Sequence, residues 1–200
     1  MARPRRSAAG VFLVGVVLLG TGTLFVGPSP AGLSSRLGLA PRRAYKDDEE
    51  RVGFMDSPIG QAIGALSKAL SDSPLNDAKI WLAKQQAGEY NEAEVSAKLN
   101  SYIKDNSVVM FSYSKCPFCI KAKKELDDMG ANYLVLDVDK MGDEGKHLRA
   151  ELAERTRRTS MPNIFIAGEG IGGCNDGPGM MTLKKEGTLL PMLEKAGAMR

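Results

Sequence analysis

Residues 108–129 read VVMFSYSKCPFCIKAKKELDDM, and this stretch decides the fold that the chain adopts. Residues 108–111 are all apolar, which predicts a short strand. Residues 117–129 follow the spacing of an amphipathic helix, with four residues on its apolar face: Cys119, Ala122, Leu126 and Met129. A strand therefore turns directly into a helix, and two cysteines, Cys116 and Cys119, lie at the junction.

The pattern of apolar residues on either side extends this unit into an α/β fold. Before the strand, Asn91 and Glu94 form a capping pair for a helix that leads into the fold. After the helix, the sequence predicts a strand at 133–138, a helix at 144–155, a hairpin of 163–167 and 170–172 that turns at Gly168 and Glu169, and one or two helices over 180–196. A strand-helix-strand unit implies parallel pairing with a right-handed crossover, and the hairpin adds antiparallel strands. We therefore expect a mixed sheet flanked by helices.

Cys116 lies where a helix start favours the thiolate form of cysteine. As the N-cap residue, it faces unpaired backbone N–H groups and the positive end of the helix dipole. Free cysteine has a pKa of about 8.5, and helix starts and adjacent cations lower it into the range of about 3.5 to 7.5. Lys115 supplies such a cation, and Pro117 suits the first helical position because it has no N–H to satisfy. We therefore predict that Cys116 is the nucleophile and that Cys119, one turn further on, is the resolving thiol.

The alternative function of a Cys-x-x-Cys pair is to supply half of a zinc site. Two further ligands would be needed, and the chain offers only Cys174 and its single histidine, His147. His147 lies in a predicted helix, where we expect a solvated surface position rather than a catalytic role. No metal is therefore expected, and the cysteine pair is interpreted as redox-active.

From about residue 91 to residue 200, the chain resembles a glutaredoxin. Three motifs carry the resemblance, in the order and at the distances found in that family: Cys116-Pro117-Phe118-Cys119, Thr159-Ser160-Met161-Pro162-Asn163 and Gly172-Gly173-Cys174-Asn175-Asp176. The resemblance implies a thioredoxin-like fold with a mixed four-stranded sheet. It also implies a groove beside Cys116 that binds glutathione, the reductant and co-substrate.

The resemblance assigns glutathione-binding roles to a set of residues: Lys115, Phe118, Arg149, Ser160, Met161, Pro162, Gly173, Cys174, Asn175 and Asp176. The bond before Pro162 is expected to be cis, and the backbone of Met161 to pair with the cysteinyl part of glutathione. Asp176 is expected to hold the γ-glutamyl end together with the backbone before it. Arg149 matches the family position for the glycyl carboxylate, with a solvated helix charge as the alternative. Lys115 lies two residues after the family's usual lysine, so it either contacts glutathione or only tunes the thiolate.

The cysteine pair and the resemblance together predict a dithiol, glutathione-dependent thiol-disulfide oxidoreductase. Its expected partners are glutathione and proteins that carry glutathione mixed disulfides or disulfide bonds, and we expect a monomer. Cys174 is interpreted as a small buried filler, with a third redox role as the alternative. The alternative function is to carry an iron-sulfur cluster that glutathione ligates and that Cys116 bridges between two subunits. Pro117 argues against the cluster, because relatives that specialise in clusters tend to have glycine or serine there.

The distribution of charge separates a leader from the rest of the chain. Of the 200 residues, 43% are apolar and 26% are charged, which is typical of a globular protein. Residues 1–45 contain six arginines and no acidic residue, which leaves 21 basic and 24 acidic side chains in residues 46–200. A basic excess confined to one end argues against a nucleic-acid-binding surface and indicates a targeting segment.

Residues 1–45 have the features of a targeting leader. Arginines precede an apolar stretch at 11–19 and small residues around 20–22, as in a signal peptide. Residues 25–44 contain no acid and open on phenylalanine, so the leader resembles the bipartite plastid presequence of algae whose plastids lie inside extra membranes. We therefore expect a plastid location. The alternative is a retained anchor over residues 8–26 in the secretory pathway, which would be the only membrane contact.

Residues 46–90 are expected to form a helical extension or linker before the glutaredoxin domain of residues 91–200. Ser57-Pro58 predicts the start of a helix whose apolar face carries Ile59, Ile63, Leu66 and Leu70. A second helix is predicted over residues 76–87, after the Ser73-Pro74 turn. The segment either binds a partner or a membrane surface, or it packs as an appendage or serves as a spacer.

Overall fold

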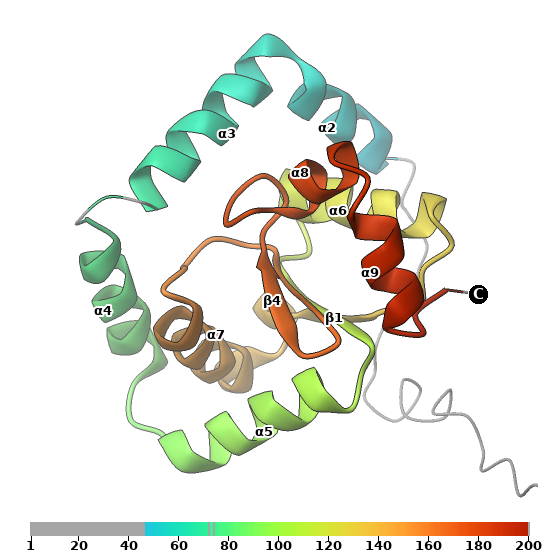
Figure 1. Cartoon of the computed structure of the whole chain (residues 1–200). Coiled ribbons are helices and arrows are strands. Elements are labelled where there is room, and N and C mark those ends of the chain that lie inside the picture. The colour runs from blue at the N-terminus through green and yellow to red at the C-terminus, as the bar shows by residue number, and fades with distance from the viewer. Residues whose placement is uncertain (1–46, 72, 74, 200) are drawn as a thin grey trace, which may run out of the picture. The chain divides into compact units, whose positions relative to one another are not determined.

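The computed structural model describes residues 47–71, 73 and 75–199, with a mixed four-stranded sheet at its centre (Figure 1). In spatial order, the strands are β2 (Leu134–Asp137), β1 (Val108–Ser112), β3 (Asn163–Ile166) and β4 (Glu169–Gly172). Strand β1 runs parallel to β2, with Val109 opposite Leu134, and antiparallel to β3. The predicted combination of a parallel unit and an antiparallel hairpin is therefore confirmed.

Helices cover both faces of this sheet. They are α5 (Glu92–Lys104), α6 (Pro117–Asp128), α7 (Gly142–Thr156), α8 (Met180–Lys185) and α9 (Leu189–Lys195). Alternate residues of β1 point into two cores, as the pleat of a strand requires. Met110 packs with Leu126 of α6 and Leu193 of α9, whereas Phe111 packs with α5 and α7. The burial of β1 between both layers fixes the position of the loop that follows it.

Local signals predicted most element boundaries, and the hairpin turn is the exception. The N-cap at Asn91 is confirmed, because its side-chain oxygen accepts a hydrogen bond of 3.2 Å from the N–H of Glu94. The hairpin turns at Ala167 and Gly168, with φ angles of 49° and 84°, and Glu169 is already the first residue of β4. A two-residue turn of this kind needs positive φ at both positions. The prediction was wrong by one residue because alanine rarely adopts such a conformation.

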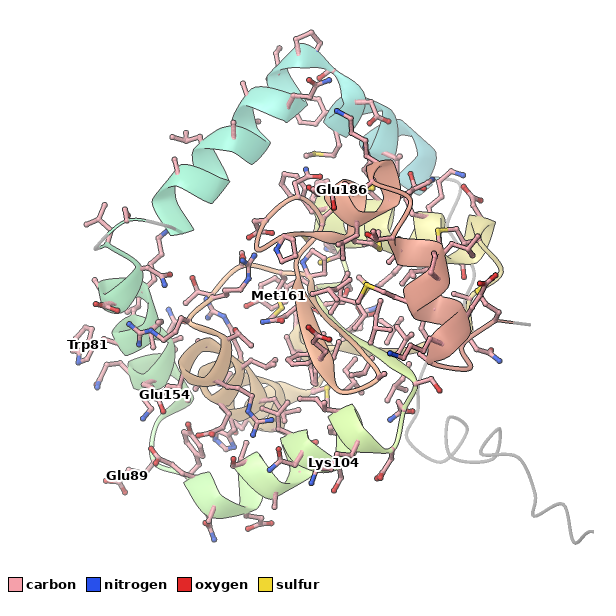
Figure 2. All side chains as sticks on the ribbon, in the orientation of Figure 1. Trp81, Glu89, Lys104, Glu154, Met161 and Glu186 are labelled. Atoms are coloured by element: carbon pink, nitrogen blue, oxygen red, sulfur yellow. The ribbon has the colours of Figure 1, made fainter. Side chains whose placement is uncertain are left out.

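Within the described residues, three helices precede α5: α2 (Asp47–Asp56), α3 (Pro58–Ser71) and α4 (Leu75–Ala87). The sequence predicted α3 and α4 but not α2. Helix α2 packs on α6 and α4 packs on α7, so α3 runs between two contacts with the domain (Figure 1). The outer faces of α3 and α4 remain apolar and exposed, with Trp81 pointing away from the protein (Figure 2).

The leader predicted over residues 1–45 lies outside the described residues, and so does the alternative anchor at 8–26. Within the part of the chain that the structure describes, no helix has both the length and the apolar character needed to cross a membrane.

Candidate active site

Cys116 is located at the start of α6, directly after the loop that follows β1. Its backbone is extended (φ −76°, ψ 121°) and Pro117 begins the helix, so Cys116 is the N-cap residue, as predicted. The half-buried thiol donates a hydrogen bond to the carbonyl of Met161, with 3.7 Å between sulfur and oxygen. Figure 2 labels Met161 near the centre of the domain. The segment before β3 therefore forms one wall of the site around Cys116.

The environment of Cys116 favours its thiolate and lowers its pKa to about 7. The largest cause is the hydrogen bond from the Cys119 thiol, which partial burial of Cys116 opposes. The backbone N–H groups of Cys119 and Phe118 lower the pKa further, and these are the unpaired donors of the first helical turn. The predicted effect of the helix start is therefore confirmed. At neutral pH, the thiolate is therefore a much larger share of Cys116 than of a free cysteine.

Cys119 has the opposite character, because its side chain is completely buried. Burial is the main cause that raises the pKa of Cys119, and the neighbouring Cys116 raises it further. Its sulfur accepts a hydrogen bond of 3.4 Å from the N–H of Tyr113. Cys119 therefore keeps its proton and donates it toward Cys116. Cys116 is therefore the reactive thiol of the pair, and Cys119 stays protonated.

Among the lysines, Lys123 contributes most to the lowered pKa of Cys116, rather than the predicted Lys115. Lys115 is adjacent in sequence but exposed. Lys123 lies seven residues after Cys116, which is two helical turns and therefore the same face of α6. An ion pair of 2.8 Å with Asp137 of β2 holds it in place.

Removing the charge of Lys123 is expected to raise the pKa of Cys116. Lys123→Gln takes away a cation that stabilises the thiolate, so the midpoint of Cys116 reactivity moves above its value of about 7. Lys115→Gln, the matched control, is expected to move the midpoint less because Lys115 is exposed. The rate of iodoacetamide alkylation measured against pH reports both midpoints. A larger shift in the Lys115 variant would show that the sequence neighbour is the important cation after all.

The second and third predicted motifs meet through Ser160 and Asp176. The hydroxyl of Ser160 donates a hydrogen bond of 2.8 Å to Oδ2 of Asp176. A Cβ atom on Gly173 would lie only 2.2 Å from Oδ1 of Asp176, so this close approach requires glycine. The bond between Met161 and Pro162 is cis, as predicted. The two loops therefore form one continuous surface next to Cys116.

Arg158 belongs to this surface, although it is not among the residues predicted from the sequence. Its guanidinium forms an ion pair with Oδ2 of Asp176, and both side chains are nearly buried, at 14% and 15% exposed. Arg158 also donates a hydrogen bond of 3.3 Å to the hydroxyl of Ser160. No local signal distinguishes this arginine from its basic neighbours, because the contact joins two separate loops. Both partners of Asp176 use the same oxygen, Oδ2.

Arg149 is located at the edge of the site, on α7. Its guanidinium carbon lies 5.9 Å from the centroid of the Tyr113 ring, and it donates a hydrogen bond of 2.9 Å to Oε1 of Gln86 on α4. The Nε atom of Arg149 is buried and has no hydrogen-bond partner among the described residues. The side chain is half-buried, so it is less solvated than an ordinary surface arginine.

Several other predicted residues are found near the site or away from it. Phe118 is half-buried and Asn175 is exposed, and both lie at the rim of the site. Cys174 is buried, as predicted, and its burial raises its pKa to about 12. We expected His147 to be solvated at the surface. Its ring instead stacks on Tyr90, with 4.6 Å between the ring centroids. The described residues contain no group of three side chains that could hold a metal ion.

Comparison with known proteins points to one family. The glutaredoxin family model matches residues 108–171. A glutaredoxin of Vernicia fordii is 41% identical over 103 residues, which are 52% of this chain and 95% of that protein. Glutaredoxin-C6 of Oryza sativa subsp. japonica is 40% identical over 102 residues, which are 51% of this chain and 88% of that protein.

Solved structures show the same relationship. The crystal structure of a buckwheat glutaredoxin-glutathione complex matches with a TM-score of 0.51 and 33% identity, and covers 55% of this chain and 96% of that one. This likeness confirms the predicted thioredoxin-like fold. With its redox pair at the start of α6, its cis-proline loop and these relatives, the chain belongs to the glutaredoxin family of glutathione-dependent thiol-disulfide oxidoreductases.

Proposed function

We propose that the chain reduces protein-glutathione mixed disulfides through the Cys116 thiolate. The thiolate attacks the glutathione sulfur, the mixed disulfide breaks, and the substrate protein leaves as a thiolate that takes up a proton. Cys116 is then joined to glutathione. A second glutathione thiolate attacks the glutathione sulfur of this adduct, which releases glutathione disulfide and restores the Cys116 thiolate.

The contrast between the two thiols of the redox pair carries this proposal. Cys116 is half-buried with a pKa lowered to about 7, whereas Cys119 is completely buried with a raised pKa. A thiolate, not a thiol, is the nucleophile in disulfide exchange. Cys116 is therefore the sulfur that reacts first. Cys119 acts when the substrate is a protein disulfide, where it displaces the substrate by closing a Cys116–Cys119 disulfide.

The residues around Cys116 suit the groups of glutathione. The carbonyl of Met161 already contacts the Cys116 sulfur, so its backbone can pair with the cysteinyl part of a glutathione bound to that sulfur. Asp176 offers Oδ1 to the γ-glutamyl ammonium, while Oδ2 is engaged by Arg158 and Ser160. Arg149 brings the positive charge of its guanidinium to the edge of the site, where it can attract a carboxylate, although its Nε is itself buried. The buckwheat relative whose structure is a glutathione complex supports this assignment by family.

Turnover combined with cluster reconstitution tests the proposal against the iron-sulfur alternative. We expect the protein to reduce a glutathionylated peptide with glutathione as the electron donor. Anaerobic incubation with iron, sulfide and glutathione is expected to yield little visible charge-transfer absorption, because Pro117 fixes φ near roughly −65° and stiffens the loop beside Cys116. Pro117→Gly should bind more cluster and form more dimer. A coloured wild-type dimer that is inactive in turnover would instead make cluster binding the leading function.

We also propose where in the cell the protein is located and how its chain is divided into segments. The acid-free, arginine-containing leader of residues 1–45 supports import into a plastid, after which residues 46–90 precede the glutaredoxin domain of residues 91–200. Fusing residues 1–45 to a fluorescent protein and locating the fluorescence in algal cells tests whether this segment directs import into the plastid. Fluorescence retained in the secretory membranes would favour the anchor at residues 8–26.

A further inference from the structure

Helix α3 is held to the domain at both of its ends. Before α3, Met55 of α2 is buried and Asp56 forms an ion pair with Lys121 of α6. After α3, the amide of Asn76 in α4 donates a hydrogen bond of 2.6 Å to the carbonyl of Arg157, at the end of α7. Helix α3 is therefore a strap between two anchors, as Figure 1 shows.

Among the residues of α3 whose exposure the structure describes, the buried ones are glycines. Gly60 and Gly64 are buried one turn apart, and a Cβ atom on Gly60 would lie 2.4 Å from the carbonyl oxygen of Phe54. The large apolar residues of α3 whose exposure the structure describes point outward: Ile59, Ile63 and Leu66. The described part of the inward face therefore buries little apolar surface, and the two anchors hold α3 to the domain.

Gly64 brings the strap to the rim of the active site. A Cβ atom on Gly64 would lie 3.5 Å from Nδ2 of Asn175 and 3.6 Å from Cε1 of Phe118. Phe118 belongs to the redox motif, and Asn175 immediately precedes Asp176. Asn175 is nevertheless exposed and Cys116 only half-buried, so the strap borders the site without covering it.

We propose that α3 is a steric wall that selects substrates by size, admitting glutathione and small mixed disulfides while limiting the approach of folded glutathionylated proteins. The inference rests on the proposed function for the identity of the substrates. All these substrates contain glutathione, and they differ in the molecule to which glutathione is joined. That molecule must lie over the surface around Cys116 during the reaction. Helix α3 occupies part of that surface beside Phe118. If α3 leaves this surface open for only about a tenth of the time, kcat/KM for a bulky substrate falls roughly tenfold.

Enlarging Gly64 is the first test. Gly64→Leu is too large for the present contact, so α3 must move away from Phe118. We expect kcat/KM for glutathionylated serum albumin to rise roughly tenfold, and that for a glutathionylated short peptide to change less than about twofold. Ala65→Leu is the matched control on the exposed side of α3 and should change neither value. Gly64→Ala fits the space and should keep the discrimination.

A charge exchange at the first anchor gives an independent test. Asp56→Lys replaces the ion pair with a repulsion between Lys121 and the new lysine, so the strap loosens and turnover of glutathionylated albumin should increase. The double variant Asp56→Lys with Lys121→Asp restores an ion pair and should return the wild-type preference for the peptide. Equal acceleration of both substrates would show a lid over the glutathione site instead of a wall. Slower turnover of albumin would show that α3 is a docking surface, and either result overturns the proposal.

Chemical labelling tests whether α3 limits access to Cys116, independently of whether the protein has the proposed enzymatic function. The rates of Cys116 alkylation by iodoacetamide and by a maleimide on a long polyethylene glycol chain depend on access and not on turnover. Gly64→Leu should accelerate the bulky reagent several-fold and leave iodoacetamide unchanged. An unchanged ratio of the two rates overturns the wall even if the enzyme is active. A changed ratio supports it even if the enzyme turns over neither substrate.

Discussion

Cys116→Ser is expected to abolish deglutathionylation, whereas Cys119→Ser is expected to retain much of it. A serine hydroxyl does not ionise near neutral pH, so the first variant loses the nucleophile and its rate falls to the uncatalysed background, by roughly a thousandfold or more. In the second variant the Cys116 adduct is still resolved by glutathione itself. Initial rates with a glutathionylated peptide at saturating glutathione measure both effects.

The choice of replacement at Cys119 adds a sharper comparison. The hydrogen bond from Cys119 is the main cause of the lowered Cys116 pKa, and a serine hydroxyl can donate a similar bond. Cys119→Ala cannot, so its Cys116 pKa should rise and its activity at pH 7 should fall below that of Cys119→Ser. A Cys119→Ser variant as inactive as Cys116→Ser would show that the buried thiol is indispensable, contrary to the proposed route.

Asp176→Asn is expected to raise the KM for the glutathionylated peptide by roughly 10- to 100-fold. The substitution keeps an oxygen for the hydrogen bond from Ser160 but removes the charge that would pair with the γ-glutamyl ammonium. A hydrogen bond to a charged group contributes about 1.5 to 3 kcal/mol, and every 1.4 kcal/mol is about tenfold in affinity. The value of kcat should change much less, because Asp176 does not contact the reacting sulfur. Steady-state kinetics with varied peptide concentration separates the two parameters.

A matched variant controls for the loss of one negative charge. Asp128 pairs with Lys124 on the exposed face of α6, and Asp128→Asn should leave the KM unchanged. Thermal melting curves show whether the unpaired Arg158 destabilises the Asp176 variant. An unaltered KM in a folded Asp176→Asn protein would mean that the γ-glutamyl group binds elsewhere.

The parts of the fold that the sequence predicts are those that depend on neighbours along the chain. A uniformly apolar run before Pro117 indicated β1, and the cysteine before the proline indicated the N-cap, and both are confirmed. The direction of the Cys116 pKa shift could also be anticipated, because the donors that lower it belong to its own helix: the Cys119 thiol first, and then the backbone N–H groups of Cys119 and Phe118. In each case the physical cause lies within a few residues of its effect.

The parts that could not be predicted depend on contacts between distant segments. Arg158 pairs with Asp176 from another loop, and nothing in its immediate sequence distinguishes it from Arg157. Lys123 affects Cys116 through the shared face of α6, whereas sequence adjacency favoured Lys115. The contact of Gly64 with Phe118 joins the extension to the redox motif. It could not be predicted, because a glycine in a helix does not indicate which residue it contacts.

Trapping the reaction intermediate tests the role of Cys116 most directly. The Cys119→Ser protein is mixed with one equivalent of a glutathionylated peptide in the absence of free glutathione, then quenched with acid and analysed by mass spectrometry of the whole protein and its peptides. The account predicts one glutathione per protein, bound to Cys116, together with one equivalent of free peptide thiol. Glutathione found on Cys174, or the peptide instead of glutathione joined to Cys116, would contradict it.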